Sequence, residues 1–126
     1  MRAVDTNVLV RLITRDDPRQ TATAESFIAN GAWVSTLAVA QAIWVLGSVY
    51  DVQAAEQAEV VKMLLNHRQL VLQEPETVSA ALDLFRTRPA LGFSDCLMLE
   101  AARRSGHLPL GTFDRNLAKV DGAERL

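Results

Sequence analysis

Short apolar runs alternate with helical segments along the whole chain, and this alternation restricts the possible fold more than any other feature. Four runs are typical of strands, at 2–4, 32–35, 70–73 and 108–112. Segments with the apolar spacing of helices separate them. Strands that are connected through helices favour a parallel sheet with right-handed crossovers. The sequence therefore predicts a single α/β domain over residues 1–126, with a short central parallel sheet flanked by helices.

Most of the predicted helices carry a start or an end signal. The first, 6–14, follows Asp5, and the second has Pro18 in its first turn. Ser35 or Thr36 caps a long third helix that is apolar almost all the way round, so we expect that helix to be buried. Later helices are expected over 53–66, from Pro75, from a Ser94 cap to Gly106, and over 114–120.

Composition and charge exclude several classes of protein. The 13 Lys and Arg residues against 15 Asp and Glu residues give a net charge of -2, so nucleic-acid binding would need a local positive patch. The longest apolar stretch, 37–46, is well short of the roughly 20 residues that span a bilayer. Asp5 stands where a signal peptide needs apolar residues. With Cys96 as the only cysteine, we expect a cytoplasmic protein without membrane insertion or an internal disulfide.

Three aspartates lie where parallel α/β sheets bind their ligands. Asp5 ends the first predicted strand, Asp114 follows the fourth, and Asp95 lies in the first turn after Ser94. Ligands bind beyond the carboxyl ends of the strands in such sheets. Each aspartate alone is explained equally well as a helix cap. If the strands that carry Asp5 and Asp114 are neighbours, however, their carboxylates converge, and a cation must offset the repulsion.

The residue types around these acids favour one class of chemistry. Oxygen ligands without a nearby His or Cys select Mg²⁺ or Mn²⁺ over zinc, and we expect His67 and His107 at the surface. A metal held by carboxylates activates water and neutralises charge on a phosphoryl group, as phosphodiester hydrolysis requires. Four polar residues in the same loops can orient water or phosphate, namely Thr6, Asn7, Ser94 and Thr112.

Three segments carry a resemblance to a known family. They are "VDTNVLVRLI" at 4–13, "FSDCLMLEAARRSG" at 93–106 and "LGTFDRNLAKV" at 110–120. In their order and spacing they resemble the signatures of PIN-domain ribonucleases, specifically the VapC-type toxins of bacterial toxin–antitoxin pairs. With "WVSTLAVAQAIWVL" at 33–46, the resemblance extends over essentially the whole chain.

This resemblance implies a PIN-like three-layer α/β fold and an endoribonuclease site that depends on Mg²⁺ or Mn²⁺. It also implies a homodimer and a heteromeric complex with a cognate antitoxin, whose C-terminal segment covers the site. Asp5, Asp95 and Asp114 match the first, third and fourth acids of the family's site. The second acid, normally a Glu in the helix after the second strand, falls on Gln41.

Gln41 leaves two functions open. Its amide oxygen still accepts or ligates but lacks the charge that attracts a divalent ion, so activity would be reduced. The chain is then either an RNA-cleaving toxin or a catalytically silent PIN protein that acts by binding its antitoxin or RNA. An unpartnered Gln in a buried apolar helix costs about 1–3 kcal/mol, so we expect a polar cavity beside it.

Arginines supply the candidate RNA contacts, namely Arg86, Arg88 and Arg115, although a solvated helix face explains them equally well.

A receiver-type phosphoacceptor domain is an alternative, because it also gathers acids at strand ends. It would need a paired acid after the first strand and a Lys at the end of a late strand. Asp5 is a single acid and Lys119 falls in a predicted helix, which disfavours that alternative.

Overall fold

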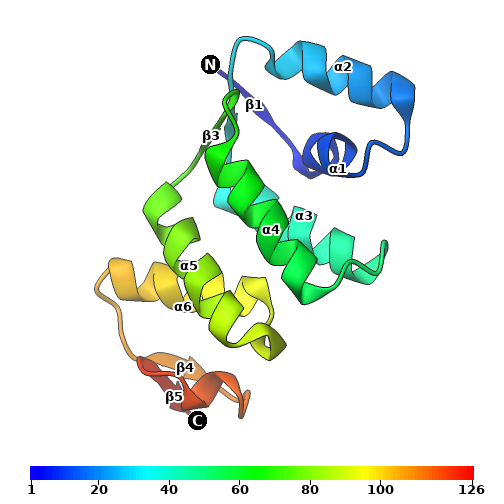
Figure 1. Cartoon of the computed structure of the whole chain (residues 1–126). Coiled ribbons are helices and arrows are strands. Elements are labelled where there is room, and N and C mark those ends of the chain that lie inside the picture. The colour runs from blue at the N-terminus through cyan, green and yellow to red at the C-terminus, as the bar shows by residue number, and fades with distance from the viewer. The chain divides into compact units, whose positions relative to one another are not determined.

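Three short strands form a parallel sheet in the computed structural model, which describes residues 1–126 (Figure 1). They are β1 (Arg2–Val4), β2 (Ala32–Val34) and β3 (Leu70–Leu72), in the order β1-β2-β3. Val4 pairs with Val34, and Val34 pairs with Leu72. These three side chains are buried. Because side chains alternate across a strand, the neighbouring Trp33 and Val71 lie on the opposite face and are exposed.

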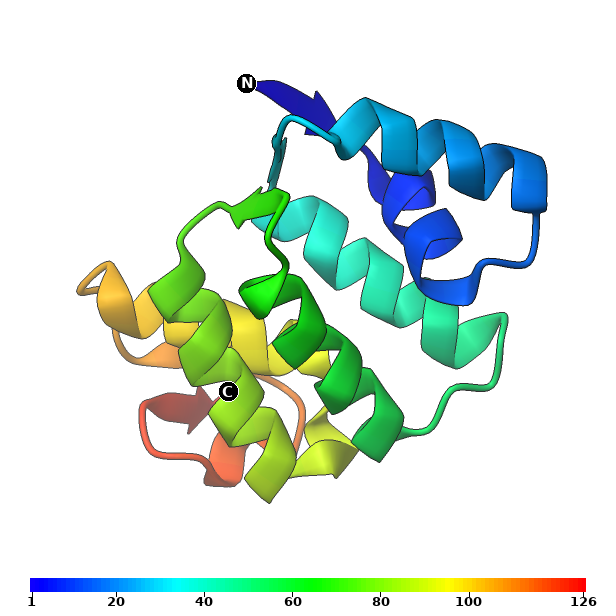
Figure 2. The same cartoon turned by 45° about the horizontal axis from the view of Figure 1, so that its top comes forward.

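Four helices complete the first of two compact units, residues 1–75. They are α1 (Thr6–Thr14), α2 (Pro18–Ile28), α3 (Thr36–Ser48) and α4 (Ala54–Asn66). α1 packs against α2 and α3, and α3 also packs against α4, so that α3 lies between α1 and α4 (Figure 2). The largest side chains in this core are fully buried: Leu9, Val10, Val39, Leu46, Val61 and Leu64.

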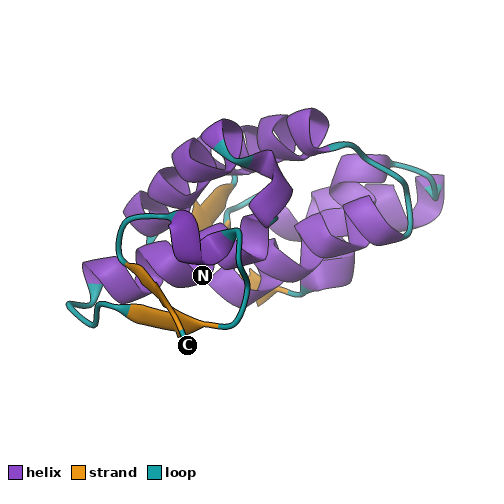
Figure 3. Cartoon of the chain, turned by 90° about the horizontal axis from the view of Figure 1, so that it is seen from below, coloured by secondary structure: helices purple, strands orange, loops and turns teal.

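The second unit, residues 76–126, holds two helices and a two-stranded parallel sheet. α5 (Pro75–Thr87) and α6 (Phe93–Arg104) are followed by β4 (Leu110–Thr112) and β5 (Ala123–Arg125). Figure 3 shows these two strands side by side. Phe85 and Phe93 pack edge to face with ring centroids 6.0 Å apart in the core. Short 3₁₀ helices lie at Pro89–Leu91 and Leu117–Lys119.

The α/β class and the short parallel sheet are confirmed, and the prediction of one domain over residues 1–126 stays a prediction. Local start signals operate as expected in the first unit. The side chains of Asp5, Asp17 and Ser35 accept hydrogen bonds from the backbone N–H groups of Val8, Gln20 and Ala38, at 3.1, 3.0 and 3.1 Å. None of the helices combines the length and the hydrophobicity that crossing a bilayer requires.

The prediction of Ser94 as a helix cap is wrong. α6 begins one residue earlier, at the buried Phe93, and no side chain caps it. The preceding Gly92 has a φ of 82°, a left-handed conformation that favours glycine. This turn lets the helix start at Phe93, whose ring packs on Phe85.

One prediction near the C-terminus is corrected, and one strand was missed. Residues 114–120 form only a short 3₁₀ helix, at Leu117–Lys119, after a turn that Asp114 caps. β5 was not predicted, because "AER" lacks the apolar alternation that marks a strand. The fourth predicted strand therefore pairs with a strand that the sequence did not reveal.

A polar network joins the end of α1 to the segment after α3. Arg11 Nη1 donates to Asp16 Oδ1 at 2.7 Å and to the Tyr50 hydroxyl at 3.2 Å, and that hydroxyl donates to Asp16 Oδ2 at 3.0 Å. Thr14 Oγ1 also donates to Asp16, at 2.8 Å. Hydrogen bonds from Thr14 and Tyr50 and the charge of Arg11 lower the pKa of the Asp16 carboxyl.

We expect Asp16→Asn to lower the Tm at neutral pH. Because the folded-state pKa of Asp16 is depressed, its stabilisation is complete above the unfolded-state pKa, about 4, and is lost as the pH falls through the folded-state pKa. Thermal melts from pH 7 down to pH 2 should therefore show the two proteins converging in acid. Asp83→Asn removes an exposed carboxylate without a bonding partner and serves as the control. A Tm difference that persists unchanged in acid would contradict the role of the Asp16 charge.

Candidate active site

Asp5 lies at the carboxyl end of β1 and begins α1. One carboxylate oxygen, Oδ1, accepts the 3.1 Å hydrogen bond from Val8 N, which makes Asp5 the helix cap. The side chain is exposed, and its other oxygen makes no hydrogen bond within its unit. Because capping occupies only one of the two oxygens, the cap and a metal ligand are compatible roles for this residue.

Gln41 lies in the middle of α3 and contacts the start of α1. Thr6 Oγ1 donates a 2.7 Å hydrogen bond to Gln41 Oε1, which joins two residues 35 positions apart in the sequence. The structure thus groups Asp5, Thr6 and Gln41 around the start of α1.

The expectation that α3 is buried all round, with a polar cavity around Gln41, is wrong. Gln41 is exposed, and on the same helix Leu37 and Trp44 are 65% and 66% exposed. α1 and α4 pack on α3, whose buried residues are Ala38, Val39, Ala42, Ile43 and Leu46. The burial penalty expected for Gln41 therefore does not arise, and its partner is the hydroxyl of Thr6.

In the second unit, the structure brings Asp95 and Asp114 close enough to interact. Asp95 is half-buried in the first turn of α6, and Asp114 is exposed two residues after the end of β4. Burial raises the pKa of Asp95, and the negative charge of Asp114 raises it further. No Lys or Arg forms an ion pair with either carboxylate. The pair is therefore a site of uncompensated negative charge.

Backbone groups hold Asp114 in place. Its Oδ1 accepts hydrogen bonds from the N–H groups of Asn116 and Leu117, both at 2.8 Å, while Thr112 Oγ1 accepts from Asp114 N at 3.0 Å. Thr112 thus positions the backbone of Asp114.

The other predicted residues occupy varied positions. Asn7 is exposed in the first turn of α1 and Ser94 is half-buried beside Asp95. The predicted RNA contacts, Arg86, Arg88 and Arg115, are all exposed. His107 is exposed as expected. His67 is half-buried, and its Nδ1 accepts a 3.1 Å hydrogen bond from Gln69 N.

The donor atoms fit a hard divalent cation. Side-chain oxygens are the available ligands at Asp5 and Gln41 in the first unit and at Asp95 and Asp114 in the second, as Mg²⁺ and Mn²⁺ prefer. Within neither unit do three His, Cys, Asp or Glu side chains form a metal-binding group. Cys96 is buried, and burial together with the charges of Asp95 and Glu100 raises its thiol pKa to about 11, so it remains a neutral thiol.

We expect Asp95→Asn to stabilise the metal-free protein at pH 7. Because the folded-state pKa of Asp95 is raised, folding becomes less favourable as the pH rises from the unfolded-state pKa through the folded-state pKa. The amide is always neutral and escapes that loss. Urea unfolding in EDTA should give the variant the larger free energy of unfolding at pH 7 and similar values for both proteins at pH 3. Equal stabilities at pH 7 would contradict this interpretation.

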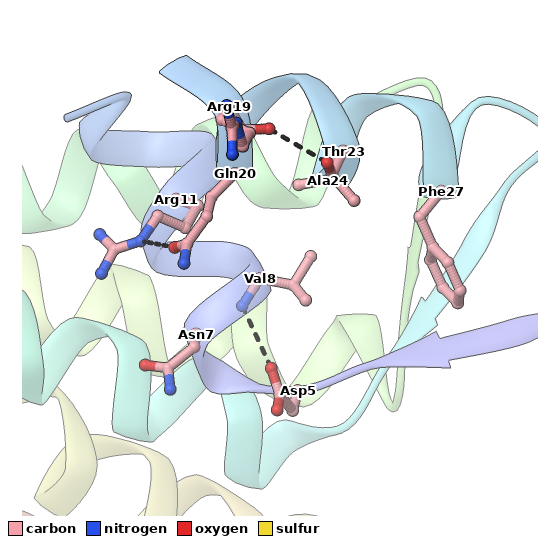
Figure 4. A pocket seen from close by; sticks show the side chains of 9 residues that line it. All are labelled: Asp5, Asn7, Val8, Arg11, Arg19, Gln20, Thr23, Ala24 and Phe27. Atoms are coloured by element: carbon pink, nitrogen blue, oxygen red, sulfur yellow. Dashed lines mark hydrogen bonds between the residues drawn. The ribbon is translucent and has the colours of Figure 1, made fainter. Parts of the chain in front are cut away.

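A pocket of about 470 Å³ opens beside Asp5, between α1 and α2 (Figure 4). Sequence reasoning did not identify the α2 residues that line it, namely Arg19, Gln20, Thr23, Ala24 and Phe27. The available signal was weak: two polar side chains, Arg19 and Gln20, follow Pro18 in the first turn of a helix that is otherwise rich in small residues.

Comparison with known proteins identifies one family. The family model described as PIN domain matches residues 2–123 of the chain. That range spans both units and contains Asp5, Gln41, Asp95 and Asp114. No curated protein and no solved structure matches significantly.

Proposed function

Because this chain belongs to the PIN-domain family, we propose that it is an endoribonuclease, dependent on Mg²⁺ or Mn²⁺, that hydrolyses RNA phosphodiester bonds. Membership of the family itself indicates a nuclease-type function, and PIN domains typically use divalent metal ions. The observation that carries the proposal is the Asp95–Asp114 pair, where two carboxylates interact without a cationic partner. Such a pair has the charge and the donor atoms that a divalent cation requires.

We assign the metal ligands to Asp5, Asp95 and Asp114, with Gln41 at the position of the usual Glu. A bound metal would supply an activated water and neutralise charge on the phosphoryl group. The chain's own residues position these groups. Thr6 fixes the Gln41 oxygen, Thr112 fixes the Asp114 backbone, and the remaining polar residues, Asn7 and Ser94, orient water or phosphate.

RNA, an antitoxin and a second copy of the chain are the proposed partners. Arg86, Arg88 and Arg115 present exposed guanidinium groups for phosphate contacts. The resemblance to VapC-type toxins supports a role as the toxin of a type II toxin–antitoxin pair in the cytoplasm. It also supports a homodimer that binds its cognate antitoxin. The exposed Leu37 and Trp44 on α3 supply apolar surface for such a partner chain.

Gln41 favours one alternative function. With an amide in place of a carboxylate, the site has three negative charges instead of four, and its attraction for divalent ions is weaker. The alternative is a catalytically silent PIN protein that binds its antitoxin or RNA without cutting.

Cleavage of a labelled single-stranded RNA separates the two functions. The purified chain is incubated with Mn²⁺, Mg²⁺ or EDTA, and Asp114→Asn serves as the control for contaminating nucleases. We expect slow cleavage with either metal and none in EDTA or with the variant. Binding without cleavage at saturating Mn²⁺ would support the silent alternative. The absence of both binding and cleavage would overturn the nuclease and would leave only a silent protein that binds an antitoxin.

A further inference from the structure

The pocket between α1 and α2 combines an apolar wall with polar groups beside Asp5. Val8, Ala24 and Phe27 form the wall, and Asn7, Arg19 and Gln20 supply the polar groups (Figure 4). Its volume of about 470 Å³ lies in the range of pockets that hold small organic ligands, roughly 300–1,000 Å³. Every lining residue belongs to the first unit, so the pocket is complete within residues 1–75.

Some polar groups of this pocket already have partners within the chain, and others have none. Arg11 is engaged, because its Nε donates to Gln20 Oε1 at 2.7 Å and its Nη1 pairs with Asp16. The Arg19 guanidinium, in contrast, makes no hydrogen bond or ion pair, and neither does the side-chain amide of Asn7. Gln20 uses only its oxygen, which leaves its NH₂ group available. The pocket thus presents one uncompensated positive charge and two available amide groups.

We propose that this pocket binds one nucleotide of a single-stranded RNA, adjacent to the bond that is cut. The inference rests on the proposed ribonuclease function, which makes RNA the substrate and Asp5 a metal ligand beside the bond that is cut. The base would lie against Val8 and the part of the Phe27 ring that Arg2 leaves free, since the Arg2 guanidinium already stacks 3.8 Å from the ring centroid. Arg19 would contact a phosphate, and the amides of Asn7 and Gln20 would bond to the base edge. Asp5 links the two sites, because it lines the pocket and is also a proposed metal ligand.

An acidic peptide is the competing occupant, since Arg19 would also attract its carboxylates. The lining of the pocket favours the nucleotide. The apolar wall and the available amides together match a planar base, which needs both a flat contact and donors and acceptors at its edge.

Arg19→Gln tests the phosphate contact, and Arg68→Gln is the matched control. Arg68 belongs to the same unit, is also exposed without a bonding partner, and lies outside the pocket. Binding of a fluorescent single-stranded RNA is measured in EDTA at several salt concentrations. We expect Arg19→Gln to weaken affinity about tenfold and to reduce the slope of log K against log salt by about 0.7, as for one lost phosphate contact. Arg68→Gln should change neither quantity.

Photocrosslinking locates the base independently of charge. An RNA that carries 4-thiouridine should crosslink to the peptides containing Val8 and Phe27, and Arg19→Gln should reduce that yield. Unchanged RNA affinity and salt slope in Arg19→Gln, or crosslinks confined to other segments, would overturn the proposal. Loss of binding to a synthetic glutamate-rich peptide, with RNA binding unaffected, would instead assign the pocket to a protein partner.

The test also separates this proposal from the proposed function. If the chain cuts RNA with Mn²⁺ but Arg19→Gln has an unchanged KM, the nucleotide pocket is wrong and the nuclease stands. If no cleavage occurs but the Arg19-dependent binding and the crosslinks are found, the nucleotide pocket stands and the nuclease is wrong.

Discussion

Gln41→Glu should increase the rate of RNA cleavage at saturating Mn²⁺ by about tenfold or more. Even near a protein surface, a carboxylate within a few ångströms of a divalent ion gains more than about 1.4 kcal/mol, which corresponds to a factor of ten in rate. The affinity for Mn²⁺, measured by calorimetric titration, should rise in the same variant. A site that uses two metal ions gains most, because the second ion has the fewest ligands.

The surroundings of Gln41 allow this change without damage to the fold. Thr6 donates to the side-chain oxygen of residue 41, and a carboxylate oxygen accepts the same hydrogen bond. The side chain is exposed and the two residues are nearly isosteric, so packing is not disturbed. Any loss of stability from the added negative charge should appear in EDTA and disappear when Mn²⁺ is supplied.

Gln53→Glu is the matched control for added charge. Gln53 is an exposed residue of the same unit, at the start of α4. It should leave cleavage and metal affinity unchanged. If Gln41→Glu cuts RNA no faster than the Gln41 protein, residue 41 is not the missing acid of the site.

Asp5→Asn should reduce the affinity for Mn²⁺ about tenfold or more and abolish cleavage, with no loss of Tm in EDTA. Asn caps a helix as well as Asp does, so the hydrogen bond from Val8 N is retained. What the variant loses is a negatively charged ligand, and removal of that charge relieves any repulsion from neighbouring acids.

Asp17→Asn shows whether a helix cap alone explains such an effect. Asp17 caps α2 through a 3.0 Å hydrogen bond from Gln20 N, the same geometry that Asp5 has on α1. We expect Asp17→Asn to bind Mn²⁺ as the unchanged protein does. Equal Mn²⁺ affinities for Asp5→Asn and the unchanged protein would show that Asp5 is only a helix cap and not a metal ligand.

The elements of the first unit could be predicted because their signals are local. The Asp17 cap followed by Pro18 defines α2, and the short apolar run before Ser35 defines β2. The second unit was predicted less well. β5 could not be recognised, because its own three residues contain no strand pattern. It takes strand geometry through its pairing with β4. The start of α6 is set by the packing of Phe93 on Phe85, which spacing along the chain does not reveal.

In the candidate site, too, local sequence signals revealed some residues and tertiary packing determined the others. Asp5, Asp95 and Asp114 were identifiable because each follows a strand or begins a helix. The Thr6–Gln41 hydrogen bond and the pocket lined by Arg19 and Phe27 depend on how α1 packs against α3 and α2. Contacts of that kind arise from tertiary packing and are not encoded in any short segment.

The burial of Cys96 gives the second unit its own reporter of unfolding, and the tryptophans give one to the first unit. Its protonated, buried thiol cannot react with a disulfide reagent until the second unit opens, so the labelling rate measures that opening. Both tryptophans, Trp33 and Trp44, belong to the first unit, so intrinsic fluorescence follows that unit alone. Recorded together across a urea titration, the two signals would give coincident midpoints if residues 1–126 unfold cooperatively, and separate midpoints if each unit melts by itself.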